Sequence, residues 1–173
     1  VLFNSSGTLN VNSAVSFPAA TTFTFLAGTL AGTGTLTTNG TFNWSGGLMT
    51  GAGVTTVNGP FNLGGLTAIS AGRTLNNATT ANWTSGLNDG MWTGTGSVIN
   101  NTGTWDAQTD GASIVNYYGG ATAFNNSGTF KKSAGSGSTF INIPFVNTGT
   151  VNVQSGTLSL GAGGSSATAL NVS

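Results

Sequence analysis

Short runs of alternating apolar and polar residues recur along the whole chain. In residues 41–44, Phe42 and Trp44 alternate with Thr41 and Asn43. The same period of two occurs at Phe61/Leu63, Ile141/Ile143/Phe145, Val151/Val153 and Leu158/Leu160. This period is typical of β-strands that bury one face. Gly, Asn-Gly and Gly-Gly separate the runs and supply the positive φ angles of tight turns. The pattern predicts many short strands joined by tight corners.

The runs belong to a longer repeat. The segment GTGTLTTNGTFNW (32–44) returns without a gap as GAGVTTVNGPFNL (51–63), and AGRTLNNATTANW (71–83), TGTGSVINNTGTW (93–105), NNSGTF (125–130) and VNTGTV (146–151) continue it with drift. Its anchor positions are Gly40, Gly59, a degenerate site near Thr79, Gly103, Gly128 and Gly149. A spacing of roughly 19–25 residues is typical of a solenoid, and the signatures of leucine-rich and helical repeats are missing. The repeat predicts an all-β fold, a parallel β-helix of about eight coils and about 40 Å in length.

Aligning the repeats predicts which side chains stack on neighbouring coils. One inward column contains Phe42, Phe61, Ala81, Trp105, Phe130 and Val151, and its neighbour contains Trp44, Leu63, Trp83, Ala107, Lys132 and Val153. The outward column between them contains Asn43, Asn62, Asn82, Asp106, Lys131 and Asn152. The Trp residues fall at inward positions, so we interpret the aromatic columns as core packing and the Asn column as an amide ladder along the axis.

Two expectations concern the charged members of these columns. Asp106 and Lys131 lie on adjacent coils and are expected to form a surface ion pair. Lys132 falls in an inward column, where an ammonium group needs a partner or a route to water. We expect a bulge or corner that lets Lys132 reach solvent past the small Ala107.

The composition excludes several classes of chemistry. The chain has 173 residues, of which only three are Lys or Arg and three Asp or Glu, with no His and no Cys. Three cations cannot follow a phosphate backbone, so no nucleic-acid partner is expected. No apolar run is long enough for a membrane helix. Without His or Cys, the His-dependent nucleophile systems and transition-metal sites are not possible. We therefore predict a protein that is not an enzyme, with no catalytic residues, metal site or cofactor.

The longest coil, DAQTDGASIVNYYGGATAF (106–124), contains a candidate ligand site. Two carboxylates, Asp106 and Asp110, and two phenols, Tyr117 and Tyr118, are candidates for contact with a sugar or a cation. The alternative is a solvated loop. Ice binding is a further candidate, because Thr33/Thr35, Thr102/Thr104 and Thr148/Thr150 form Thr-x-Thr pairs, but other residues interrupt the expected rows.

The run NNSGTFKKSAGSGSTFINIPFVNTGTVNVQSGTLSL (125–160), together with the GTGTLTTNGTFNW units, resembles the repeat regions of large secreted bacterial β-strand-repeat proteins. These include filamentous-haemagglutinin-like adhesins and autotransporter passenger regions. The resemblance covers nearly the whole chain and rests on the style of the repeat. It implies a right-handed parallel β-helix that is exported to the bacterial cell surface or released from it, where it acts as a stalk, adhesive or matrix fibre.

Residues 1–173 are expected to form one solenoid domain that starts and stops in mid-pattern. Solenoids need caps over their open strand edges, and no cap is visible. We expect either a segment of a longer protein, continued by adjacent coils of the same chain, or a filament subunit whose partner is another copy. The main hypothesis is therefore an extracellular structural or adhesive module, and the alternative is a module that binds glycans or another surface.

Overall fold

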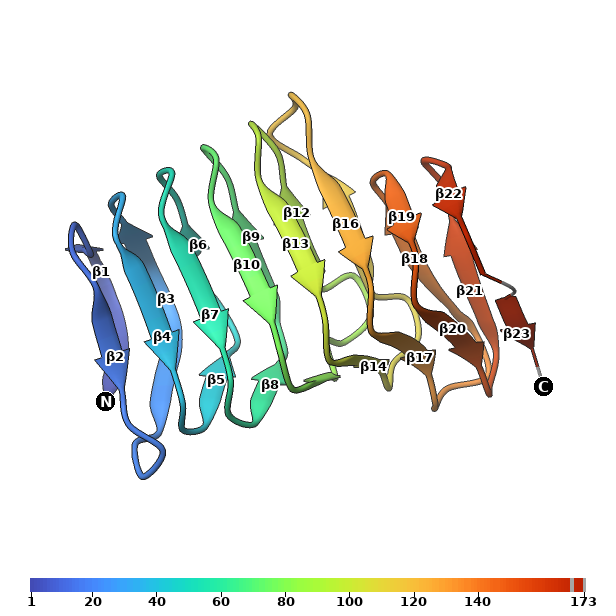
Figure 1. Ribbon diagram of the computed structural model, residues 1–173, viewed down its shortest axis with the longest axis horizontal. Helices are drawn as coiled ribbons and strands as arrows, with labels where there is room; N and C mark the ends of the chain where they lie inside the picture. The colour runs from blue at the N-terminus through green and yellow to red at the C-terminus, as the bar shows by residue number, and fades with distance from the viewer. Residues whose placement is uncertain (169, 173) are drawn as a thin grey trace.

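The computed structural model consists of strands, turns and corners and describes residues 1–168 and 170–172. No helix occurs in this part of the chain. Every strand pair is parallel, and an eight-stranded sheet contributes one strand to each coil. The fold is thus a parallel β-helix of about eight coils, stacked from the N-terminal to the C-terminal end (Figure 1). This confirms the fold class predicted from the repeat.

Each coil passes through three rows of strands, which we call the first, second and third faces. The first face contains β2 (Val15–Phe17), β4 (Thr35–Thr38), β7 (Val54–Val57), β10 (Thr74–Asn77), β13 (Val98–Asn101), β16 (Ala123–Asn126), β19 (Phe145–Asn147) and β22 (Gly164–Ser166). The second contains β5 (Phe42–Trp44), β8 (Phe61–Leu63), β11 (Thr80–Trp83), β14 (Thr104–Ala107), β17 (Thr129–Lys132), β20 (Thr150–Val153) and β23 (Leu170–Val172). The third contains β6 (Leu48–Met49), β9 (Leu66–Ile69), β12 (Gly90–Thr93), β15 (Ser113–Asn116), β18 (Ser138–Asn142) and β21 (Thr157–Leu160). The long strands β1 (Leu2–Asn10) and β3 (Phe23–Ala31) pair with each other, and β3 runs through both the second and third faces.

The register of the second face is the one that the repeat alignment predicts. Phe42, Phe61, Ala81, Trp105, Phe130 and Val151 are paired on successive strands, as are Trp44, Leu63, Trp83, Ala107, Lys132 and Val153. All are buried. The rings of Phe23, Phe42 and Phe61 stack nearly parallel, with centroids 5.3 and 5.2 Å apart. Ala81 interrupts this stack, and the Trp105 ring packs edge-on against Phe61 across the gap, at 6.2 Å.

Close packing of the backbone explains the anchor glycines of the repeat. A Cβ atom at Gly128 would lie 2.0 Å from the carbonyl oxygen of Gly103, and one at Gly149 would lie 2.0 Å from that of Gly128. Such distances are too short for any side chain, so these corners need glycine on steric grounds. Positive φ angles, which the sequence analysis expected at the corners, occur at other glycines such as Gly47 and Gly65. On the preceding coil, Thr79 occupies the position equivalent to Gly103, as the alignment of the repeat predicts.

A column of buried asparagines ends the strands of the first face. Asn77, Asn101, Asn126 and Asn147 occupy one inward position on successive coils. The Nδ2 group of each of the first three donates to the Oδ1 atom of the next, at 2.8, 2.7 and 2.7 Å. Each of the three also donates to a backbone carbonyl, those of Thr104, Thr129 and Thr150. The ladder thus supplies hydrogen bonds to polar groups inside the coil.

Candidate functional site

The four candidate residues of the longest coil do not converge on one site. Asp106 lies in β14 on the second face, and Asp110 lies in the corner that precedes β15. Tyr117 and Tyr118 directly follow β15, at its other end. A four-residue strand spans about 13 Å. The structure therefore separates the carboxylates from the phenols, and each pair has its own surroundings.

Asp106 forms an ion pair with Lys131, as predicted, but the carboxylate is buried. Lys131 Nζ lies 2.9 Å from Asp106 Oδ2. Ser133 Oγ donates to Oδ1 at 2.6 Å, and Gln108 Nε2 donates to Oδ2 at 3.0 Å. Burial raises the pKa of Asp106, but these hydrogen bonds and the Lys131 charge outweigh it, so the pKa is lowered overall. The neighbouring members of the outward column, Asn43, Asn62 and Asn82, form an amide ladder.

Lys132 does not reach solvent, contrary to the expectation of a bulge or corner. Its strand keeps a regular register with both neighbours, and its side chain is fully buried. The ammonium group turns into the corner between the second and third faces, where it donates to Asp110 Oδ1 at 2.9 Å and to the carbonyls of Thr109 and Ala134 at 3.0 and 2.9 Å. The small Ala107 on the preceding coil leaves room in this column, but the space leads to a carboxylate and not to water.

Both carboxylate oxygens of Asp110 accept hydrogen bonds. Its Oδ2 atom accepts a hydrogen bond from the backbone N–H of Gly137 at 3.0 Å, while Oδ1 accepts from Lys132. The Gly137 N–H, followed by Lys132, lowers the pKa of Asp110. Both carboxylates of the candidate loop thus serve the packing of successive coils. Their geometry supports a structural role more directly than contact with a ligand.

Arg73 is a second buried cation, in the corner between the third and first faces. Its side chain is buried, and Nε and Nη2 donate to Thr55 Oγ1 at 3.2 and 2.8 Å. No carboxylate lies within ion-pair distance among the described residues. Burial lowers the pKa of Arg73 to about 10. Arg73 therefore differs from Lys132, which has a carboxylate partner.

Trp92 was missed by the sequence analysis, which placed the tryptophans at inward positions. Trp44, Trp83 and Trp105 are buried, but Trp92 in β12 points outward and is partly exposed. Met91 takes the inward position next to it. A strand that contains two adjacent apolar residues must expose one of them, because successive side chains point to opposite faces. The adjacent apolar pair Met91 and Trp92 is visible in the sequence, so the exposure of one of the two could have been predicted.

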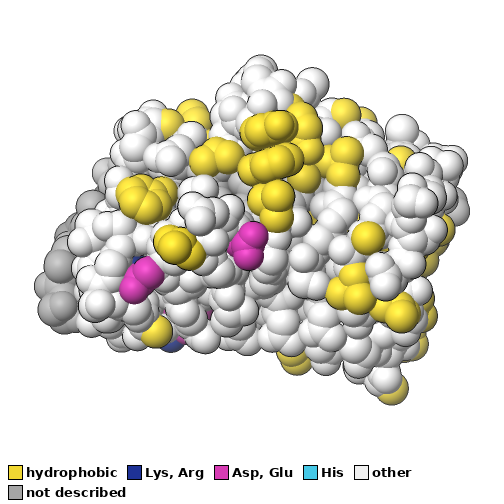
Figure 2. All heavy atoms as spheres, turned by 180° about the vertical axis from the view of Figure 1, so that it is seen from behind, with side chains coloured by type: hydrophobic (Ala, Val, Ile, Leu, Met, Phe, Trp, Pro, Cys, Tyr) yellow, Lys and Arg dark blue, Asp and Glu magenta, His cyan; other side chains and the backbone are white. Residues whose placement is uncertain are grey.

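Trp92 and the two tyrosines form an exposed aromatic cluster on the third face. The Tyr117 ring stacks on the Trp92 indole with centroids 3.8 Å apart and planes at 8°. Tyr118 packs edge-on against Trp92 at 6.4 Å and against Tyr117 at 5.2 Å. Figure 1 shows the third face behind the first, and Figure 2 shows the hydrophobic side chains that gather in a patch on this rear side. The phenols predicted as candidates therefore belong with Trp92 and not with the carboxylates.

A groove of about 260 Å³ opens beside this cluster. It is lined by Gly28, Gly47, Leu48, Leu66, Thr67, Ala68, Trp92 and Tyr118. The groove forms because side-chain size changes along one outward column. In this column, Ala68 is paired with Leu48 on one neighbouring strand and with Trp92 on the other. The methyl group of Ala68 leaves a hollow between its two larger neighbours. None of the lining residues is charged.

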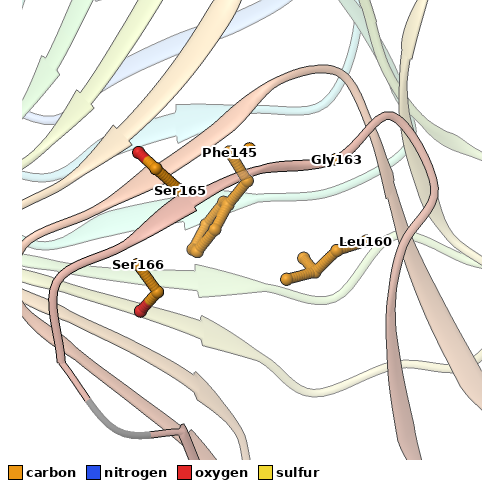
Figure 3. A pocket seen from close by; sticks show the side chains of 6 residues that line it. Phe145, Leu160, Gly163, Ser165 and Ser166 are labelled. Carbon is orange, nitrogen blue, oxygen red and sulfur yellow. The ribbon is translucent and has the colours of Figure 1, made fainter.

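A smaller hollow of about 170 Å³ lies near the C-terminal end of the described chain (Figure 3). Phe145 and Leu160 supply its apolar wall, and Gly163, Gly164, Ser165 and Ser166 complete it. Phe145 follows the inward column of Phe124 on the first face. The hollow is therefore the open end of the solenoid interior.

Two of the three threonine pairs contribute to a row on the second face, whereas Thr35 is paired with Val54 on the first face. Thr80, Thr104, Thr129 and Thr150 stack on successive strands of the second face, so this row is longer than the sequence analysis expected. The next outward column contains Asn82, Asp106, Lys131 and Asn152 in place of a second threonine row. A two-row ice-binding lattice is therefore not formed on this face.

Comparison with known proteins adds no relationship. No protein-family model matches the chain, and no curated protein or solved structure matches it.

Among the described residues, there is no group of three or more acidic, His or Cys side chains that could hold a metal ion. No helix long and apolar enough to cross a membrane occurs in the described part of the chain either.

Proposed function

We propose that the chain is a non-enzymatic, structural or adhesive β-solenoid module of an extracellular bacterial surface or matrix protein. It pairs at its ends with further coils of the same kind, from another copy or from the same polypeptide. The observation that carries the proposal is the repeat of the interior columns from coil to coil, in which each coil pairs edge to edge with the next. The resemblance to secreted β-strand-repeat proteins supports the extracellular setting through the style of the repeat.

The N-terminal end leaves core positions exposed. Leu9 pairs with the buried Leu30, and Val15 pairs with the buried Leu36, so both occupy inward columns. They are nevertheless 40% and 37% exposed. Exposed parallel edges with apolar side chains favour pairing with another strand. Near the other end, a hollow with an apolar wall from Leu160 and the largely buried Phe145 lies beside Gly163 and Gly164 (Figure 3).

The near-zero charge of the chain is consistent with association. The formal net charge at pH 7 is zero, so long-range repulsion between copies is small. A solenoid also distributes its stability over the contacts between neighbouring coils, so added coils extend it without a new core. Both properties suit a stalk or fibre.

Edge variants test the proposal. Leu9→Lys and Val15→Lys place charges at the open N-terminal end, where lysines block strand addition. Sedimentation velocity over a concentration series should show oligomers for the wild-type chain and monomers for the double variant. Leu87→Lys is the matched control, since Leu87 is 74% exposed in a corner away from the ends. Oligomers that survive in the double variant would place the interface elsewhere, and a wild-type monomer at every concentration would leave only adjacent coils of one chain as the partner.

A further inference from the structure

The aromatic stack on the third face has one side on which no other ring of the described residues stacks. Tyr117, which follows β15, stacks against one face of the Trp92 indole at 3.8 Å. The neighbouring position on the preceding strand is Ala68, whose side chain ends at a methyl group. Trp92 lines the groove, and its other ring face is turned to the coil of Ala68. A flat ring entering the groove would continue the stack of Tyr117 and Trp92.

The lining defines the chemistry of the occupant. It contains no charged residue, so it does not favour an anionic or cationic ligand. It presents one flat aromatic wall, aliphatic walls from Leu48 and Leu66, and a floor at Ala68. A glucose-type pyranose matches this surface, because its ring hydrogens lie on its two faces and its hydroxyl groups lie around its edge. The C–H face packs on an aromatic face, and the hydroxyls remain free for hydrogen bonds.

One phenol lines the groove. Tyr118 forms no hydrogen bond through its hydroxyl group with another described residue, and its side chain is 39% exposed. A phenol hydroxyl is protonated at neutral pH and can both donate and accept, and burial, followed by the neighbouring Tyr117, raises the pKa of Tyr118 further. Binding sites of this type combine an apolar surface with a few polar groups that fix the orientation.

We propose that the groove beside Trp92 is a subsite for a neutral, glucose-type polysaccharide, one ring of which stacks on the open face of the indole. The subsite goes beyond the structural role proposed above and does not depend on end-to-end association. It gives the solenoid a means of contacting a glycan surface from its side. A single stacking ring binds weakly, with a dissociation constant of about 1 mM, and repeated contacts along an array raise the avidity.

Tryptophan fluorescence can report on this site alone. Trp44, Trp83 and Trp105 have no exposed surface, whereas Trp92 is partly exposed. Acrylamide in solution should therefore quench the emission of Trp92 and leave the other three nearly unaffected. Cellohexaose, a neutral β-1,4-linked glucose oligomer, should reduce this quenching in a saturable way. Oligogalacturonate of similar length, which is anionic, should protect much less.

Two variants remove the subsite by different routes. Trp92→Leu keeps an apolar side chain but removes the flat ring, and it should weaken cellohexaose binding at least about tenfold in ligand-observed NMR. Ala68→Leu keeps Trp92 and fills the floor of the groove from an outward position, so it should abolish the protection of Trp92. Val146→Ala, at an exposed position on the first face, is the matched control and should bind as the wild type does. Thermal unfolding of all three variants verifies that they are folded.

The outcomes separate the proposal from its alternatives. Saturable binding that both groove variants lose and the control keeps supports the subsite. Absence of saturable binding to cellohexaose, or binding that survives in Trp92→Leu and Ala68→Leu, overturns it. Protection of Trp92 that rises with protein concentration in the absence of sugar also overturns it, because it would show that a second copy covers the groove.

Discussion

Lys131 and Lys132 are adjacent in sequence, yet their ammonium groups lie in different surroundings. Lys131 points outward and is partly exposed beside Asp106, whereas Lys132 is fully buried and depends on Asp110 and two carbonyl oxygens. Exposed ion pairs contribute little, but a buried charge that loses its partner is strongly destabilising. The cost of desolvating Lys132 therefore makes Asp110 a structural residue.

The first prediction follows from the dependence of the buried Lys132 on Asp110. Asp110→Ala should lower the free energy of unfolding more than Lys132→Met, because the first leaves a buried cation without its carboxylate and the second replaces the cation with an apolar side chain of similar length. Urea unfolding measures both. Adding Lys132→Met to Asp110→Ala should restore part of the stability. A double variant less stable than Asp110→Ala alone would contradict the buried-charge explanation.

The acid dependence of stability is the second prediction. The pKa values of Asp106 and Asp110 are both lowered in the folded chain, so near pH 3 to 4 the unfolded state binds more protons than the folded state. Their contribution is complete above about pH 4 and is lost as the pH falls through the folded pKa values. The urea midpoint should therefore drop between pH 6 and pH 3. The Asp106→Asn/Asp110→Asn double variant should show a smaller drop, and an equal drop would contradict the assignment.

At the scale of strands, the predictable part of the structure is the part that repeats without gaps. The second-face columns follow from the alignment, because Phe42 and Phe61 occupy equivalent positions 19 residues apart and neighbouring coils pair in register. The third face could not be aligned in this way, since the corners before it differ in length from coil to coil. The alignment therefore could not tell which residues of a third-face strand point outward. For this reason the outward orientation of Trp92, the hollow at Ala68 and the groove were not predicted.

The buried asparagine ladder was missed for a different reason. An Asn beside Gly in a corner suggests an exposed turn residue, and the sequence analysis placed its asparagine ladder in the outward column of Asn43. In the structure, the Asn of the Asn-x-Gly-Thr motif turns inward, because it donates both to the next ladder member and to a backbone carbonyl one coil away. In the later coils, the Asn of this motif is therefore also a core hydrogen-bonding element, whereas Thr38 and Val57 occupy the equivalent inward position in earlier coils.

The third prediction compares two adjacent asparagines in β13. Asn101 is buried in the ladder, whereas Asn100 points outward between Asn76 and Asn125. Asn101→Ala removes a buried donor and acceptor and leaves the amides of its neighbours unsatisfied, which should cost about 2–3 kcal/mol of unfolding free energy. Asn100→Ala should change it by no more than about 1 kcal/mol. Urea unfolding of the two variants side by side checks the difference, and equal effects would rule out a special role for the inner ladder.

At the scale of the whole molecule, most of the surface repeats from coil to coil, and two features interrupt this repeat. The interior columns continue from the first coil to the last, and the outer faces consist mainly of uncharged Thr, Asn, Ser and Gly positions. The interruptions are the ends, with the exposed Leu9 and Val15 at one and the hollow beside Leu160 at the other, and the aromatic groove beside Trp92. The ends suit axial association, and the groove suits lateral contact with a ligand. A stalk or fibre that also binds glycans would use both.

The central claim is that the open ends of this β-solenoid join to further coils. Electron microscopy of the purified chain over a concentration series tests it most directly, with wild type and the Leu9→Lys/Val15→Lys variant imaged side by side. We expect the wild type to form thin filaments with an axial repeat of about 4.8 Å, the spacing of neighbouring strands, and the variant to remain as short single rods. Short rods of wild type at every concentration, or filaments of the variant indistinguishable from wild type, would contradict the association of chains through their ends.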